Sequence, residues 1–254
     1  MNCKICDSES IKIFSQRILK KYDVDYFRCN SCGFIQTENP YWLEESYVNP
    51  LNNDDTGILK RNNDFLKKTA AINYFMFNSG KQFLDYAGGY GVFTRLMRDT
   101  GIDCYWIDKY AKNILAIGFE ADENIKYETV TAFEVFEHMV DPKTELEKIL
   151  KYSDNIIFST VLVGDQIPDK NWWYYGFNHG QHISLYTLKS LQQLAKQYGL
   201  NFYSNGSSFH MFTKNEISNT YFKILLKLSK YGLFTFVKSK LQSKTDSDAA
   251  KIKQ

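Results

Sequence analysis

Residues 83–93 read FLDYAGGYGVF, or Phe83 to Phe93 by number. The stretch begins as an apolar strand, crosses a run of small residues and continues into the start of a helix. A loop of small residues lets a ligand approach the backbone closely, and the first N–H groups of the next helix face the same space. We therefore expect a strand–loop–helix unit that binds a ligand at Ala87, Gly89 and Gly91.

Two acidic residues near this loop indicate the kind of ligand. Asp85 precedes the loop, and an acid at that place favours a cationic or amine-bearing ligand over a pyrophosphate. Asp108 ends the next predicted strand, 17 residues after Gly91. A carboxylate there can accept both hydroxyls of a ribose. Together the two acids suit S-adenosylmethionine better than a dinucleotide.

Around the loop, residues 81–213 alternate apolar runs with helical patterns, as βαβ units do. The predicted strands cover 82–86, 103–107, 127–134 and 155–163. Helices are expected to begin near Gly91, Ala111 and Asp141, and another covers 188–198. Asn205-Gly206 separates two further strand-like runs, 200–204 and 209–213, and predicts an antiparallel hairpin.

This part of the chain resembles class I S-adenosylmethionine-dependent methyltransferases. Their first motif reads D-x-G-x-G-x-G, and the chain has Asp85, Ala87, Gly89 and Gly91 at those positions. Ala87 replaces the first glycine of the motif. The resemblance implies a Rossmann-like α/β fold whose seven-stranded sheet ends in an antiparallel hairpin. It also implies that Asp85 and the loop backbone hold the methionine part of the donor, and that Asp108 holds the ribose.

A second match lies in residues 131–138, TAFEVFEH, followed by Met-Val-Asp-Pro. Many small-molecule methyltransferases have a similar apolar-E-H ending here, followed by x-x-D-P. The end of this strand faces the ligand crevice in such sheets, so we expect Phe133 and Glu134 to border the methyl donor. Asp141 is expected to cap a helix whose first turn holds Pro142. His138 either takes part in catalysis or braces this loop, and bracing is the commoner case.

Residues 171–183, NWWYYGFNHGQHI, bring four consecutive aromatic residues and two of the four histidines together. The aromatic residues are Trp172, Trp173, Tyr174 and Tyr175. They cannot all be buried on one face, so we expect some of them to line the site of the methyl acceptor. A neutral histidine can take the proton of an acceptor hydroxyl near pH 7. We expect His182 to be this base and His179 to be the second candidate; alternatively, His182 caps the following helix or packs in the core.

Four of the five cysteines form two C-x-x-C pairs separated by 22 residues: Cys3, Cys6, Cys29 and Cys32. This spacing is close to that of a zinc ribbon, in which two tight turns complete a tetrahedral S4 shell. Zinc would supply folding energy that about 36 residues cannot obtain from a hydrophobic core. The site would be closed and structural. A redox dithiol, or four unrelated thiols, is the alternative. Cys104 lies in a predicted core strand and is expected to be buried.

The chain is expected to comprise four parts: a zinc-ribbon module (1–36), a helical connector (37–80), the donor-binding core (81–213), and a C-terminal helix with a polar tail (214–254). The combination of a zinc module with this core resembles the domain arrangement of methyltransferases in sugar-nucleotide and surface-polysaccharide pathways. That resemblance implies a small acceptor, namely a saccharide, a sugar nucleotide, or a phosphorylated or phosphoramidate intermediate of capsule synthesis. The deoxysugar C-methyltransferases are longer and have an added C-terminal domain that supplies part of their chemistry. This chain lacks the length for such a domain, so we expect O-methylation instead.

The formal net charge is only +2, so no global field indicates nucleic acid. Residues 212–254 carry nine Lys against three acidic residues and form either a solvated face or a peripheral contact with a membrane surface or anionic substrate. An apolar stripe in 217–240 is expected to pack on the core or form a homodimer.

The sequence contains no apolar run of about 18 residues, so we expect no membrane span. The start of the chain lacks the pattern of a secretory signal, which favours the cytoplasm.

Two alternatives belong to other functional classes. The first is an RNA-modifying or RNA-binding protein that grips RNA with the zinc ribbon and the Lys-rich tail. The low net charge disfavours it. The second is a non-catalytic, zinc-stabilised binding module, which the complete donor motif disfavours. The sequence does not identify the acceptor, the methylated atom or the oligomeric state.

Overall fold

The computed structural model describes residues 1–48 and 55–253, so residues 49–54 of the expected connector lie outside the described part. The chain divides into two compact units, each assembled from three stretches. Unit 1 comprises Met1–Asn52, Glu134–Lys148 and Phe158–Asn215. Unit 2 comprises Asn53–Phe133, Ile149–Ile157 and Glu216–Gln254.

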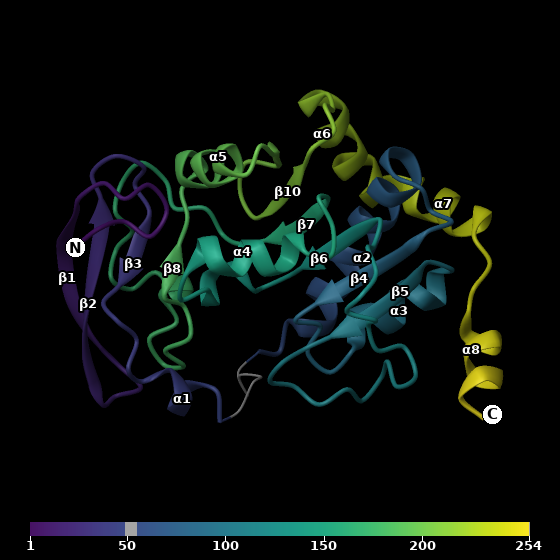
Figure 1. Cartoon of the computed structure of the whole chain (residues 1–254), viewed down its shortest axis with the longest axis horizontal. Helices are drawn as coiled ribbons and strands as arrows, with labels where there is room; N and C mark the ends of the chain where they lie inside the picture. The colour runs from purple at the N-terminus through teal and green to yellow at the C-terminus, as the bar shows by residue number, and fades with distance from the viewer. Residues whose placement is uncertain (49–54, 254) are drawn as a thin grey trace. The chain divides into compact units, whose positions relative to one another are not determined.

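Unit 1 contains a four-stranded antiparallel sheet in the order β1-β2-β3-β8 (Figure 1). The strands are β1 (Ser10–Ile18), β2 (Tyr22–Cys29), β3 (Ile35–Thr37) and β8 (Ser184–Leu185). Three of them come from the cysteine-bearing segment, and the fourth comes from much later in the chain. Apolar side chains of the sheet, among them Tyr26 of β2, pack with Trp42 and Tyr175 in one buried cluster.

Other elements lie wholly or mostly in unit 1, and two of the helices among them begin at residues whose side chains cap them. These elements are α1 (Leu43–Ser46), η1 (Phe136–His138), α4 (Pro142–Leu150), η2 (Trp173–Tyr175), α5 (Leu188–Gln197), β9 (Asn201–Ser204) and β10 (Phe209–Thr213). Asp141 accepts hydrogen bonds from the N–H groups of Lys143 and Thr144, which confirms the expected cap of α4. Thr187 and Ser190 form a capping box at α5. The antiparallel pairing of β9 with β10 confirms the hairpin at Asn205-Gly206.

The second sheet confirms the α/β class. It has six strands in the order β5-β4-β6-β7-β10-β9. In unit 2, β4 (Gln82–Tyr86) pairs in parallel with both β5 (Asp103–Ile107) and β6 (Thr129–Ala132). β7 covers Ile156–Ser159. The helices α2 (Ile58–Met76) and α3 (Val92–Thr100) also belong to unit 2, and α3 connects β4 to β5 (Figure 1). The left-handed backbone of Gly101 ends α3.

The described residues form six strands in this sheet rather than the expected seven. A single parallel bridge between Trp106 and Glu120 stands beside β5, where a seventh strand would pair. The helix expected near Ala111 is also absent from the described residues, which form turns and bends there. The N–H groups of Ile114 and Leu115 donate to the carbonyl of Tyr90 instead of to the preceding helical turn. Bonding to the loop at Tyr90 therefore replaces the expected helix.

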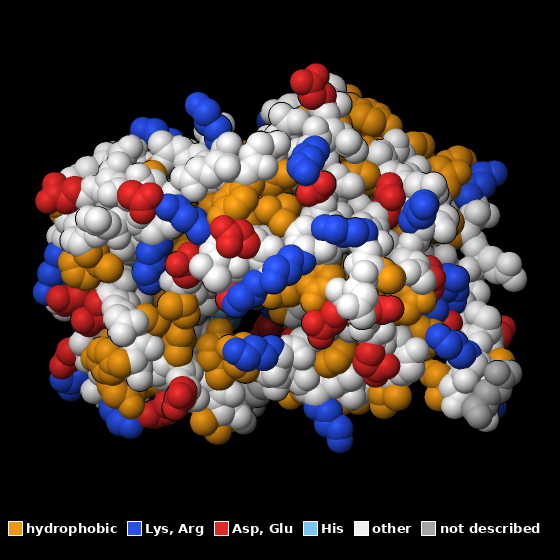
Figure 2. Space-filling view, viewed as in Figure 1, with side chains coloured by type: hydrophobic (Ala, Val, Ile, Leu, Met, Phe, Trp, Pro, Cys, Tyr) orange, Lys and Arg blue, Asp and Glu red, His pale blue; other side chains and the backbone are white. Residues whose placement is uncertain are grey.

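The C-terminal part is helical almost to its end. Its elements are α6 (Asn219–Leu228), a kinked turn η3 (Ser229–Leu233) in which Tyr231 and Gly232 have non-helical backbone, α7 (Phe234–Lys240) and α8 (Thr245–Ile252). The expected polar tail includes helix α8, whose Asp248 is buried and binds Arg98 through both carboxylate oxygens. Apolar side chains reach the surface over α6 and α7, among them Ile224 and Phe236 (Figure 2). In the described part of the chain, every helix is too short or too polar to cross a bilayer.

Candidate functional site

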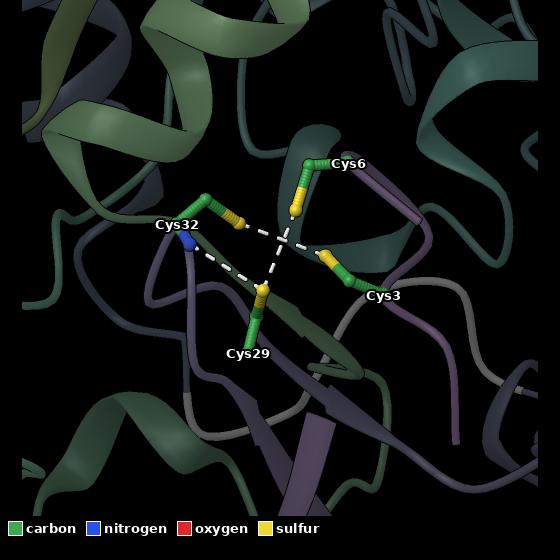
Figure 3. Close-up of side chains that lie close together, drawn as sticks. All are labelled: Cys3, Cys6, Cys29 and Cys32. Atoms are coloured by element: carbon green, nitrogen blue, oxygen red, sulfur yellow. Dashed lines mark hydrogen bonds between the residues drawn. The ribbon is translucent and has the colours of Figure 1, made fainter. Parts of the chain in front are cut away.

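The four cysteines of the two C-x-x-C pairs converge in unit 1 (Figure 3). They are Cys3, Cys6, Cys29 and Cys32, and their sulfur atoms all lie within 4.8 Å of one another. Cys3 Sγ is 3.6 Å from Cys32 Sγ, and Cys6 Sγ is 3.4 Å from Cys29 Sγ. None of the four forms a disulfide. Each pair therefore contributes one sulfur to each close contact, as the two turns of a zinc knuckle require.

The backbone around the cluster supports thiolates. Ile5 donates its N–H to Cys3 Sγ at 3.4 Å, and Ser31 donates to Cys29 Sγ at 3.3 Å. Hydrogen bonding from Cys32 lowers the pKa of Cys3 to about 5. Gly33 has φ of +73°, the left-handed backbone expected of a residue that closes a knuckle turn. Four converging sulfurs, two of which accept backbone N–H groups, fit tetrahedral zinc.

The knuckle is also tied to helix α5. Thr187, the cap residue of α5, donates its hydroxyl to the carbonyl of Cys32 at 2.6 Å. Lys189 donates to the carbonyl of Ser31, and Gln197 donates to the carbonyl of Ile5 at 2.6 Å. The cysteine cluster thus organises residues far from it in sequence.

The glycine loop of unit 2 has an unusual backbone. Ala87 and Gly89 both have φ of +56°, and Gly91, the N-cap residue of α3, has φ of +85°. A side chain at Gly89 would meet no heavy atom within 4 Å, so there is free space on that side of the loop. At Gly91 a Cβ would lie 2.9 Å from Ala116, so packing within the protein already explains that glycine.

Asp85 lies at the end of β4 with only 2% of its surface exposed. Its carboxylate accepts hydrogen bonds from the hydroxyls of Thr94 at 2.9 Å and Thr131 at 3.0 Å. Burial outweighs these two bonds and raises the pKa of Asp85 to about 7. A cation placed beside this carboxylate would favour its charged form.

Asp108 follows β5 and joins this strand to the glycine loop. Its Oδ2 accepts the N–H of Gly89 at 2.9 Å, and its Oδ1 accepts the N–H groups of Tyr110 and Ala111, both at 2.7 Å. A carboxylate has about four acceptor positions. Three are occupied, so Asp108 has room for one more hydroxyl, on Oδ2, rather than for both hydroxyls of a ribose.

The two residues after β6 lie in different surroundings. The ring of Phe133 stacks on Phe65 of α2, with centroids 4.2 Å apart, and meets Phe93 of α3 edge-on. Glu134 has φ of +55°, and its N–H and carboxylate both bond to the hydroxyl of Ser159. A non-glycine residue with this backbone is uncommon and often marks a functional position.

Three histidines meet in unit 1. The ring centroids of His138 and His182 are 5.1 Å apart, and those of His179 and His182 are 4.8 Å apart. Burial lowers the pKa of His182 to about 3 and lowers the pKa of His138 well below its usual value. All three rings are therefore neutral near pH 7, since burial lowers the pKa of His179 as well.

The hydrogen bonds of these rings decide which nitrogen is free. Nδ1 of His182 lies 2.5 Å from the carbonyl of Tyr174, so it carries the proton and leaves a lone pair on Nε2. Nδ1 of His179 instead accepts the N–H of Gln181 at 3.2 Å, which places its proton on Nε2. Nδ1 of His138 bonds the hydroxyl of Tyr47 at 2.9 Å. His182 is therefore better suited than His179 to accept a proton.

Glu137 is a residue of this cluster that the sequence analysis did not assign a role. It is fully buried, and neither carboxylate oxygen has a hydrogen-bond partner among the described residues. One of its oxygens lies within 4.8 Å of a ring nitrogen of His138 and of His182. The sequence signal was its position directly before His138, in the same E-H pair that drew attention to the histidine.

The four consecutive aromatic residues separate into core and surface positions. Tyr174 is buried, and its hydroxyl accepts the N–H of Val161 at 2.9 Å. Tyr175 is also buried and donates its hydroxyl to the carbonyl of Pro168 at 3.2 Å. Trp173, by contrast, is 73% exposed, and Trp172 is half-buried. The two tryptophans are therefore the members of this segment that are free to meet a ligand at the surface.

Comparison with protein families identifies the kind of domain to which the strand–loop–helix unit belongs. A family model described as a methyltransferase domain matches residues 59–205. No curated protein matches the chain. Similar solved structures include magnesium protoporphyrin IX methyltransferase (ChlM) from Synechocystis PCC 6803 with bound SAH, which is 14% identical, with 67% of this chain and 92% of that chain covered and a TM-score of 0.45. The plantazolicin methyltransferase BpumL, in complex with a monoazolic desmethylPZN analog and SAH, is 14% identical, with 79% and 88% covered and a TM-score of 0.47.

Proposed function

The chain belongs to the methyltransferase-domain family, and on that premise we propose that it methylates a hydroxyl group of a small acceptor with S-adenosylmethionine as the donor. The proposed acceptor is a saccharide, a sugar nucleotide, or a phosphorylated or phosphoramidate intermediate of capsule or surface-polysaccharide biosynthesis. The combination of a four-cysteine module with a donor loop supports this acceptor class. The proposed location is the cytoplasm.

The observation that carries the proposal is the glycine loop with an acid near each end, one of which bonds to the loop. Asp85 is buried directly before the loop, and Asp108 holds the loop through the N–H of Gly89. We assign the donor's amino acid part to Asp85 and the backbone from Ala87 to Gly91. The free acceptor position on Asp108 takes one ribose hydroxyl. The face of Phe133 and the backbone at Glu134 border the rest of the donor.

The donor supplies a methyl group on a positively charged sulfur. In the proposed reaction the acceptor oxygen forms a bond to that carbon, the carbon–sulfur bond breaks, and sulfur keeps the electron pair. Proton removal from the acceptor hydroxyl is assigned to His182, because its Nε2 carries the lone pair. Apart from this proton, the protein needs only to align three atoms.

The remaining assignments follow from the placement of residues in unit 1. The exposed Trp173 and the half-buried Trp172 are proposed to contact the acceptor. The residues of the cysteine cluster, within the module 1–36, are proposed to hold a structural zinc. With all four sulfurs used as ligands, this ion has no open position and would not activate a substrate.

Calorimetry with S-adenosylhomocysteine tests the donor assignment directly. We expect binding by the wild type and weaker binding by Asp108→Ala, which loses the carboxylate that positions Gly89. No heat of binding at millimolar ligand would end the proposal. A screen of sugar nucleotides and phosphorylated saccharides, read as release of S-adenosylhomocysteine, then identifies the acceptor. Turnover on RNA alone, with steeply salt-dependent binding, would favour the RNA alternative instead.

A further inference from the structure

Glu137, His138 and His182 form a second group of metal-binding side chains, separate from the cysteine cluster. Each offers one donor atom, and the three atoms lie within 4.8 Å of one another. A tetrahedral shell with bonds of about 2.0–2.2 Å places donor atoms about 3.3 Å apart. Small side-chain rotations are therefore enough to close the three donors around one ion. We propose that unit 1 binds a divalent transition-metal ion at Glu137, His138 and His182.

The carboxylate of Glu137 is the first argument for an ion. A buried carboxylate is normally bonded by donors of the protein, and a bare one is costly. Glu137 has no exposed surface, and neither of its oxygens has a hydrogen bond of good geometry from the described residues. Burial raises its pKa and outweighs the hydroxyls of Tyr174 and Thr160, which lie close enough to lower it. Asp85, the comparable acid of unit 2, is just as buried but has two hydroxyl donors. A cation would supply what Glu137 lacks.

The second argument is that each histidine ring is held by a protein oxygen at the ring nitrogen that would not bind the ion. Ligating histidines usually bond their other ring nitrogen to a protein oxygen, which fixes the ring and its tautomer. Nδ1 of His182 is bonded to the carbonyl of Tyr174, and Nδ1 of His138 is bonded to the hydroxyl of Tyr47. With Nδ1–H of His138 donating to Tyr47, Nε2 of both rings carries a lone pair for the metal.

The third argument is that the backbone joins the two segments that carry the ligands. Ile183, the residue after His182, donates its N–H to the carbonyl of Glu137 at 2.9 Å. Ser184 donates its hydroxyl to the carbonyl of Met139 at 2.7 Å. These bonds hold η1 beside the segment 182–184 without using the three ligand side chains. The site is therefore positioned before any ion arrives.

The donor set also indicates the kind of ion. Two imidazoles and one carboxylate suit zinc, iron, cobalt or manganese rather than magnesium or calcium, which prefer shells made of oxygen. Three protein ligands leave at least one position open, as in catalytic metal sites. If the proposed function holds, this position takes the acceptor hydroxyl. The ion would lower the pKa of that hydroxyl and its proton would pass to solvent, with His182 acting as a ligand instead of taking the proton itself.

Cobalt titration of the full-length, zinc-loaded protein tests the site. We expect the wild type to bind one Co2+ beyond the zinc, with d–d absorption bands and no new thiolate band. Glu137→Gln and His138→Gln should each lose this equivalent. Tyr47→Phe, which removes only the hydroxyl behind His138, should weaken Co2+ binding about 10- to 100-fold. His210→Gln is the control that keeps it, because both ring nitrogens of His210 are bonded elsewhere.

The outcomes separate this inference from the proposed function. Absence of a second equivalent at millimolar Co2+ or Zn2+ would overturn the metal site, and so would its retention in both the Glu137→Gln and His138→Gln variants. Circular dichroism and S-adenosylhomocysteine binding show whether each variant is folded, and two independent variants guard against one that is not. If the protein binds the donor but no second metal ion, only the metal-site inference is overturned. If it binds a second metal ion but not the donor, only the proposed function is overturned.

Discussion

The two clusters of candidate metal ligands in unit 1 differ in how their members are supported. In the cysteine cluster, the sulfurs meet one another and backbone N–H groups back two of them, Cys3 and Cys29. In the other cluster, the histidines are supported from behind, but the carboxylate of Glu137 is bare. The first arrangement is suited to stability and the second to a partner that comes from outside the chain. A buried group without a partner is thus a better indicator of function than a complete cluster.

Removal of a cysteine should have the largest effect on the protein and tests the structural role of the first cluster. Cys32→Ser should abolish zinc binding, and structural zinc contributes on the order of 10 kcal/mol to such modules. We expect β1, β2 and β3 to lose protection from hydrogen exchange. Metal analysis and exchange measurements check this. Cys104→Ala is the matched control, since Cys104 is buried in β5 and is not one of the four converging cysteines, so the zinc should stay in place. Full zinc content in Cys32→Ser would show that the cluster is not the zinc site.

Replacing a histidine should affect turnover rather than folding. His182→Ala is expected to lower kcat by about 10²- to 10⁴-fold, because it removes the Nε2 lone pair that serves either as the base or as a ligand of the proposed ion. Steady-state kinetics on the acceptor found by screening check this. His179→Ala should have the smaller effect, since Nδ1 of His179 already accepts a backbone N–H. Equal losses in both variants, or unchanged turnover in His182→Ala, would move the role elsewhere.

The sign of a stability change distinguishes the two kinds of cluster further. Glu137→Met should stabilise the protein that lacks the second metal by about 1–3 kcal/mol, because it removes a buried polar group without a partner. Urea unfolding measures this. The matched control is Asp248→Met, which should destabilise, since the buried carboxylate of Asp248 binds Arg95 and Arg98. A loss of stability in Glu137→Met would mean that its carboxylate has a structural role.

The smallest effect concerns Asp85, the buried acid that does have partners. Its pKa of about 7 means that it is partly protonated at neutral pH. A cationic donor amine favours the charged carboxylate, so the pKa should fall on binding, and affinity should rise with pH. The affinity is expected to fall by up to about tenfold for each pH unit below 7. Calorimetry of S-adenosylhomocysteine between pH 6 and 8 measures it.

Two controls isolate the contribution of Asp85. Asp85→Asn should remove most of the pH dependence, since the amide does not titrate. 5′-Methylthioadenosine, which lacks the amino acid part, should bind the wild type with an affinity that is independent of pH. A pH dependence that persists in Asp85→Asn would assign the proton to another group.

Features encoded by neighbouring residues could be predicted from the sequence. The boundaries of β4, β5 and β10 match the expected strands, and Asn205-Gly206 does form the expected hairpin turn. The left-handed backbone at Gly89 and Gly91 is likewise local, since a short run of small residues is sufficient to allow it. The cysteine cluster follows from the short spacing within each pair, which gives each turn the geometry of a knuckle.

Features that depend on distant partners could not be predicted. The segment near Ala111 has helical composition, but its N–H groups bond to Tyr90 instead. Helix α8 looked like a polar tail because the partner of Asp248 is Arg98, 150 residues away in the chain. Glu137 has an ordinary sequence context, and only the fold shows that its buried carboxylate has no hydrogen bond of good geometry from the described residues. His182 meets His138 for the same reason, through the backbone bond from Ile183 to Glu137.

The dependence of the cysteine knuckle on helix α5 has a consequence for synthesis of the chain. The hydroxyl of Thr187 reaches Cys32 across 155 residues, and β3 pairs with β8 across a similar distance. At about 5–20 residues per second, a ribosome needs on the order of ten seconds to deliver these partners after the cysteines have emerged. During that interval the thiols are exposed in a nascent chain that cannot yet complete its first sheet. Early zinc capture would protect them from oxidation until translation supplies the rest.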